Sequence, residues 1–171
     1  MEPLLLWGYA HILLFVFWLG ADVGVFLSAV MAKDSTMKFE SRAALMKLGL
    51  TVDLFPRTCF ALIMPVGLHM TRDFGLYEVP GWMLIGAWIV AAAWIWAFIT
   101  QFRNEGKPIA IALAKAQLVF EGVLGAIVVG IAVMSLVTGD PLSDTWFAVK
   151  ILLFGFVFWA ALGIDFAFTP A

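Results

Sequence analysis

The chain has 171 residues, of which 64% are hydrophobic and 13% charged, and its mean hydropathy is +1.03. This composition excludes a soluble domain and predicts one integral membrane domain covering residues 1–171. The formal net charge is −2 and there is no basic stretch, so the lipid bilayer, and not nucleic acid, is the expected partner.

Five apolar stretches are long enough to cross a bilayer as helices, which requires about 20 residues each. They cover residues 4–31, 48–70, 82–102, 109–137 and 146–168. The predicted fold is therefore an all-α bundle of five transmembrane helices.

Positive charge is concentrated in the first and third connecting segments. Residues 32–47 and 101–115 are rich in Lys and Arg, whereas the second and fourth connections are poor in them. By the positive-inside rule the first and third loops are cytoplasmic. This predicts a multi-pass protein of the bacterial inner (plasma) membrane, with its N-terminus outside and its C-terminus inside.

Tryptophans mark several predicted helix ends. Trp7, Trp82 and Trp146 fall at outer ends, as in an aromatic belt. The third span adds Trp88, Trp94, Trp96 and Phe98, which are expected either to face lipid or to form the wall of a flat cofactor site.

Small residues also recur four apart, at Gly20, Gly24 and Ser28 and at Gly122, Ala126 and Gly130, and we interpret them as helix-packing ridges.

The first span contains two ionisable side chains, His11 and Asp22, on one helix face. Ionisable groups are costly in lipid, so this face is expected to point toward protein or a cofactor. At a rise of about 1.5 Å per residue, His11 lies roughly 9 Å outward of the midplane and His69 roughly 10–15 Å outward. Lys150, near the start of the fifth span, lies roughly 10 Å outward as well.

Two histidines at matched depth on adjacent antiparallel helices can ligate the two faces of one haem iron. Arg72, three residues after His69, and Lys150 are candidate partners for the haem propionates. We therefore interpret His11, His69, Arg72 and Lys150 as a haem b site near the outer leaflet. Copper is the alternative metal, because His69, Met70 and other methionines would supply soft ligands.

A second polar layer is predicted on the inner side of the midplane. Asp53 and Arg57 are spaced to pair within one helix, and Asp22 is expected to bridge to Arg57 from the neighbouring helix. A structural ion-pair network and a proton path both remain open for this layer. Its members are Asp22, Asp53, Arg57, Glu121 and Asp165.

Short motifs stand out in the first, second and fifth spans. They are Trp7-x-x-x-His11 followed by Phe17-Trp18-Leu19-Gly20, then Arg57…Pro65-x-Gly67, Trp146-x-x-x-Lys150 and a His-x(6)-Trp-x-Gly-x-Asp-x-Gly pattern from His11 to Gly24. These motifs resemble those of a broad group of small bacterial membrane proteins, which includes the haem-containing, flavin-independent type of protoporphyrinogen oxidase and the copper-resistance D-like proteins. The resemblance implies that His11 is a haem ligand and that Lys150 is required for function.

Three functions fit these features. The first is a b-type haem protein for electron transport, which would exchange electrons with a quinone or a redox partner protein. The second is a haem-dependent oxidase of protoporphyrinogen type, a membrane oxidoreductase in which Lys150 would hold substrate carboxylates. The third is a transporter, copper-handling protein or assembly subunit without haem, and a homo-oligomer or a subunit of a larger complex is compatible with all three.

Overall fold

The computed structural model describes the backbone of residues 2–168 and the side chains of residues 5–163. Within this part of the chain there are five α-helices, and each is long and apolar enough to cross a membrane. The all-helical prediction is confirmed at that level. The helices are α1 (Glu2–Ala32), α2 (Phe39–Asp73), α3 (Gly81–Arg103), α4 (Pro108–Thr138) and α5 (Thr145–Phe168).

Four of the five helices, α1, α3, α4 and α5, begin and end within two residues of the predicted spans. The exception is α2, which begins at Phe39, nine residues before its apolar span. The added segment contains Ala43, Ala44, Leu45 and Met46, all good helix formers. Apolarity marks the part of a helix that fits a bilayer, and the helix itself continues beyond that part.

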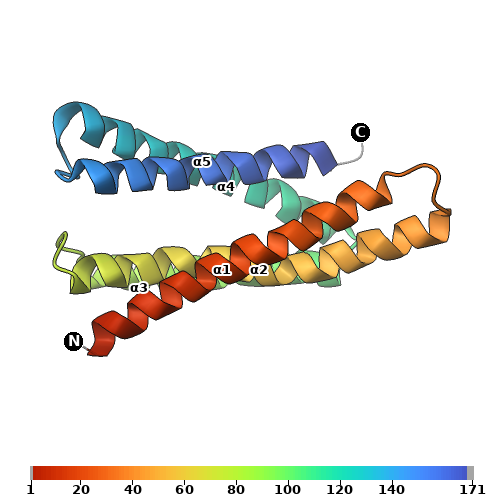
Figure 1. Ribbon diagram of the computed structural model, residues 1–171, viewed down its shortest axis with the longest axis horizontal. Coiled ribbons are helices and arrows are strands. Elements are labelled where there is room, and N and C mark those ends of the chain that lie inside the picture. Colours follow the sequence, from red (N-terminus) through yellow and green to blue (C-terminus); the bar gives the residue numbers. More distant parts are fainter. Residues whose placement is uncertain (1, 169–171) are drawn as a thin grey trace. The chain divides into compact units, whose positions relative to one another are not determined.

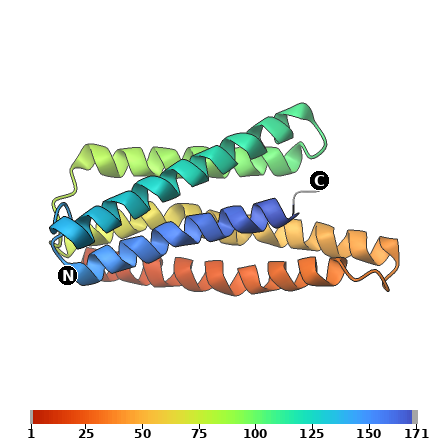
Figure 2. The same ribbon diagram turned by 90° about the horizontal axis from the view of Figure 1, so that it is seen from above.

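The helices form two compact units, Met1–Arg103 with α1 to α3 and Asn104–Ala171 with α4 and α5. In the first unit α2 lies between α1 and α3 and contacts both (Figures 1 and 2). α1 packs closely against α2 at Gly49, where an added Cβ would overlap the hydroxyl of Ser28. A glycine at this point lets the two backbones come close together.

A short turn joins α1 to α2. The carboxylate of Asp34 accepts hydrogen bonds from the backbone N–H and the hydroxyl of Thr36, at 2.8 and 2.7 Å, and these bonds lower the pKa of Asp34. Arg42 Nε donates to the carbonyl of Ala32 at 2.7 Å, which satisfies an acceptor in the last turn of α1. The turn and the start of α2 thus fix the end of α1.

The second unit is an antiparallel pair of helices (Figure 1). α4 has Pro108 in its first turn and ends at Thr138. The next residue, Gly139, caps the helix with a left-handed φ of 76° and an N–H bond to the Ser135 carbonyl. Gly125 of α4 faces Phe158 and Trp159 of α5. In the reverse direction, a Cβ added to Gly155 of α5 would lie 2.6 Å from a methyl carbon of Val129 in α4. Glycines on both helices therefore permit the close packing.

Candidate functional site

His69 is the centre of a group of side chains contributed by all three helices of the first unit. Its ring stacks on the indole of Trp7 from α1, with centroids 4.3 Å apart and planes 14° from parallel. The indole Nε1 of Trp88 from α3 donates a hydrogen bond to His69 Nε2 at 3.1 Å. We call Trp7, His69, Arg72, Asp73 and Trp88 the His69 cluster.

The charged members of this cluster lie in the last turn of α2. A guanidinium nitrogen of Arg72 is 3.5 Å from His69 Nδ1, as expected for residues three apart on one helix face. Arg72 Nε also donates to the carboxylate of Asp73 at 3.2 Å. The side chain of Arg72 is 43% exposed, so its remaining N–H groups can reach an anion at the rim of the cluster.

His11 lies against α2 at Gly67. A Cβ built on Gly67 would be 3.4 Å from His11 Cε1 and 3.7 Å from Nδ1, and the Nδ1 atom is buried. The carbonyl of Gly67 accepts a hydrogen bond from the hydroxyl of Thr71 at 2.9 Å, which keeps that carbonyl satisfied within α2. His11 therefore contacts α2 two residues before His69, and the two histidines lie at the same end of the first unit.

Further along the unit, a second aromatic group connects the same three helices. Trp18 of α1 packs on Phe60 of α2 with ring centroids 4.8 Å apart, and Phe60 meets Trp94 of α3 edge to face at 5.6 Å. Phe60 is buried, at 7% exposure. Aromatic side chains thus bracket His11 along α1, with Trp7 on one side and Trp18 on the other.

The predicted inner polar layer is present in part within this unit. Arg57 Nε donates to the carboxylate of Asp53 at 2.5 Å, the i, i+4 pair expected from the spacing. Asp22 accepts a hydrogen bond from the Trp18 side chain and interacts electrostatically with both Asp53 and Arg57. Asp53 of the same helix is thus one bonded partner of Arg57, and Asp22 of the neighbouring helix interacts electrostatically with the same guanidinium.

The other predicted site residues belong to the second unit. Glu121 is buried on α4, at 3% exposure, one helical turn after the buried Gln117. The amide nitrogen of Gln117 donates to the Leu113 carbonyl at 3.3 Å. Lys150 is exposed on α5, and the side chain of Asp165 lies outside the described residues.

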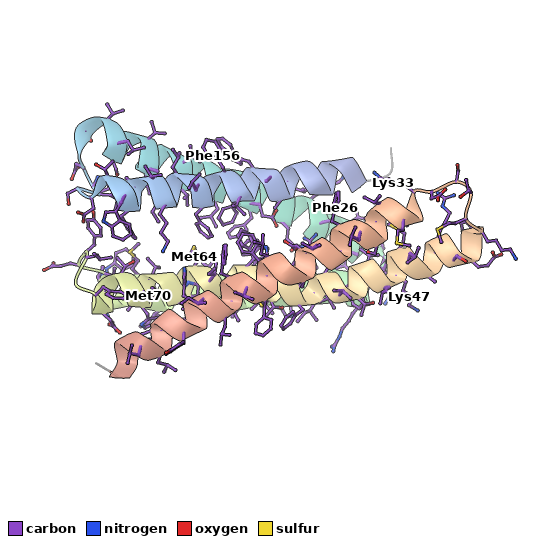
Figure 3. All side chains as sticks on the ribbon, in the orientation of Figure 1. Phe26, Lys33, Lys47, Met64, Met70 and Phe156 are labelled. Atoms are coloured by element: carbon purple, nitrogen blue, oxygen red, sulfur yellow. The ribbon has the colours of Figure 1, made fainter. Side chains whose placement is uncertain are left out.

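Within the described side chains, no three His, Cys, Asp or Glu residues are grouped to hold a metal ion. A haem iron takes only one or two protein ligands, so two histidines are a sufficient donor set. Figure 3 shows Met70, which follows His69, at the opposite end of the unit from Lys33 and Lys47.

The sequence pattern did not assign Trp7 and Trp88 to the site. Trp7 fits an aromatic belt and Trp88 fits either a lipid-facing or a cofactor-facing position, but both contact His69 directly. The one available signal was that Trp7 lies one turn before His11, and thus on the same face of α1. Nothing in a single sequence brings Trp88 to His69.

No family model matches this chain, and comparisons with curated proteins and with solved structures found no match either.

Proposed function

We propose that the chain is a multi-pass membrane protein whose first unit binds haem b for electron transfer, with His11 and His69 as the iron ligands. The observation that supports this is the contact of both imidazoles with the α1–α2 interface, at positions on α2 that are two residues apart. The similar membrane depth of the two histidines does not determine in which direction around its helix each imidazole points. Both rings face the neighbouring helix at the same end of the unit.

The residues around the histidines are suited to this role in two respects. Arg72 lies at the rim with free N–H donors, which suits a propionate carboxylate. Trp7 and Trp18 supply flat apolar surfaces on either side of His11 along α1, and such surfaces exclude water from a bound macrocycle. The Nε2 atom of His69 accepts a hydrogen bond from Trp88. Ligation of iron through Nε2 would replace this hydrogen bond with a bond to the metal.

When bound, haem b would supply one-electron redox chemistry at its iron. The chain's own contribution is binding and orientation. His11 and His69 together would hold the iron through two imidazoles, a ligand set that favours electron transfer over oxygen chemistry.

The test is a reduced-minus-oxidised absorption spectrum of the detergent-purified full chain, produced with ample haem precursor and iron. A low-spin spectrum with sharp α and β bands is expected. His11→Ala and His69→Ala should each abolish haem retention, whereas Trp96→Phe, an exposed aromatic on α3, serves as the matched control and should retain it. A colourless wild type would overturn the haem proposal.

Lys150→Ala separates two roles for this lysine. If Lys150 contacts a propionate or a substrate carboxylate, the low-spin spectrum should persist in this variant. If the lysine is an axial ligand, the spin state should change and one of the histidine variants should keep its spectrum.

The membrane orientation is part of the same proposal. Lys33 and Lys47 lie at the end of the first unit opposite Met70, the residue after His69 (Figure 3), which favours a cytoplasmic α1–α2 connection and an outward-facing His69 cluster. Reporter fusions after Lys38 and Lys107 should be active in the cytoplasm, and fusions after Arg72 and Asp140 outside it. An inside location of the Arg72 fusion would reverse this assignment.

A further inference from the structure

The hydrogen bond between Trp88 and His69 has a direction that chemistry fixes. An indole Nε1–H is a donor only, so at 3.1 Å the Nε2 of His69 must be the acceptor. In a neutral imidazole the ring proton is then on Nδ1. The contact therefore selects one of the two tautomers.

On the Nδ1 side, the guanidinium of Arg72 competes only weakly with this selection. Its terminal nitrogen is also a donor, but it lies 3.5 Å from Nδ1, at the outer limit for a hydrogen bond, against 3.1 Å for the bond from Trp88. The shorter and better-defined bond from Trp88 thus decides the tautomer.

The plane of the ring is held as well. Trp7 stacks on one face of the imidazole at 4.3 Å, so rotation of the ring about its bond to Cβ would drive its edge into the indole. Trp88 contacts the ring edge from α3, while the backbone of His69 belongs to α2. Contacts from α1 and α3 together fix both the orientation and the proton position.

We propose that Trp88 is a positioning residue that fixes His69 in the Nδ1–H tautomer, with the Nε2 lone pair directed toward α3. This is the tautomer that a metal ligand bonded through Nε2 requires. Trp88 therefore occupies, in the ligand-free chain, the position that a Lewis acid would take. The identity of that Lewis acid as haem iron rests on the proposed function, but the tautomer does not depend on it.

The chain contains only two histidines, which makes a direct measurement practical. Haem-free full-length protein labelled with ¹⁵N-histidine, in detergent micelles about two units above the ordinary imidazole pKa, would be examined by long-range ¹H–¹⁵N correlation. His69→Asn assigns the signals by difference. The expected wild-type result is a protonated Nδ1 and an unprotonated Nε2 at His69.

Trp88→Phe keeps an aromatic ring but removes the donor. It should lower the ratio of Nδ1–H to Nε2–H tautomer at His69 by roughly 2- to 10-fold, the range that one net hydrogen bond represents. Trp96→Phe on the same helix is the matched control and should leave the ratio unchanged. Circular dichroism establishes that each variant is helical before its spectrum is compared.

Two results would overturn the inference: a wild-type His69 protonated on Nε2, or a folded Trp88→Phe variant with the wild-type ratio. The wild-type measurement decides the matter even where the variant fails to fold. A chain that never binds haem but shows the Nδ1–H tautomer would contradict the proposed function and leave the role of Trp88 intact.

Discussion

The contact of His11 with Gly67 can be tested by adding side-chain atoms to Gly67 one step at a time. In Gly67→Ala the new Cβ lies 3.4 Å from His11 Cε1 and 3.7 Å from Nδ1, which is ordinary van der Waals contact. Alanine is also favoured over glycine within a helix by about 1 kcal/mol. Gly67→Ala should therefore fold with unchanged or slightly higher stability.

Gly67→Val adds two methyl groups to a Cβ that already touches the imidazole. The ring of His11 or the backbone of α2 must move, and overpacking of this kind costs about 1–3 kcal/mol. The free energy of unfolding, measured by SDS titration in mixed micelles with far-UV circular dichroism, should fall by about that amount relative to Gly67→Ala. If His11 ligates haem as proposed, haem retention should fall with it, because His11 is displaced.

The matched control is Gly86→Val on α3, where an added Cβ has no neighbour within 4 Å. That variant should keep the wild-type stability and, under the proposed function, the wild-type haem retention. Equal stability of the valine and alanine variants at Gly67, together with unchanged His11 resonances, would refute the packing of His11 against α2.

Three further predictions concern contacts within each of the two units. Gly49→Ala should be close to neutral in the wild type, because a gain of about 1 kcal/mol in helix preference is offset by displacement of the Ser28 hydroxyl. In a Ser28→Ala background the same substitution should be stabilising, and additive effects of the two substitutions in SDS titration would exclude the contact. Arg57→Leu should lower the free energy of unfolding by about 1–3 kcal/mol, and Asp53→Asn in that background should recover part of the loss. A double-mutant cycle without coupling energy would contradict the Asp53–Arg57 ion pair. Gly155→Ala should lower the free energy of unfolding by about 1–3 kcal/mol, because its Cβ would lie 2.6 Å from the Val129 side chain; an unchanged midpoint would argue against that packing.

The number, type and most boundaries of the helices could be predicted from the sequence because an apolar run of membrane length has one stable secondary structure. The start of α2 could not, since residues 39–47 carry charge and lie beyond the apolar span. Their helical preference is weak per residue and becomes visible only once the rest of α2 provides a helix for them to extend. The Asp53–Arg57 pair was predictable because it depends on spacing within a single helix.

Helix packing was harder to predict. Of the two ridges of small residues, Gly20, Gly24 and Gly130 have no neighbour within 4 Å of an added Cβ, whereas Ser28 touches Gly49. The tightest contacts are at Gly49, Gly125 and Gly155, which do not form a four-residue ridge along any one helix. Which small residues meet depends on the rotation of each helix about its axis, and periodicity alone does not determine that rotation.

The candidate site depends on that same rotation. The close contact of Ser28 with Gly49 near one end of the α1–α2 pair, and the stacking of Trp18 on Phe60 toward its middle, set how α1 faces α2. From there the helical repeat brings His11 to Gly67 and Trp7 to His69.

Each step toward the N-terminus of α1 is matched by a step toward the C-terminus of α2, as antiparallel packing requires. The sequence supplies the two histidines and their depth, but contacts several turns away determine whether their rings turn toward each other's helix. Packing at the Ser28–Gly49 contact is thus coupled to the geometry of the His69 cluster through α1, which runs as one α-helix from Trp7 in the cluster to Ser28.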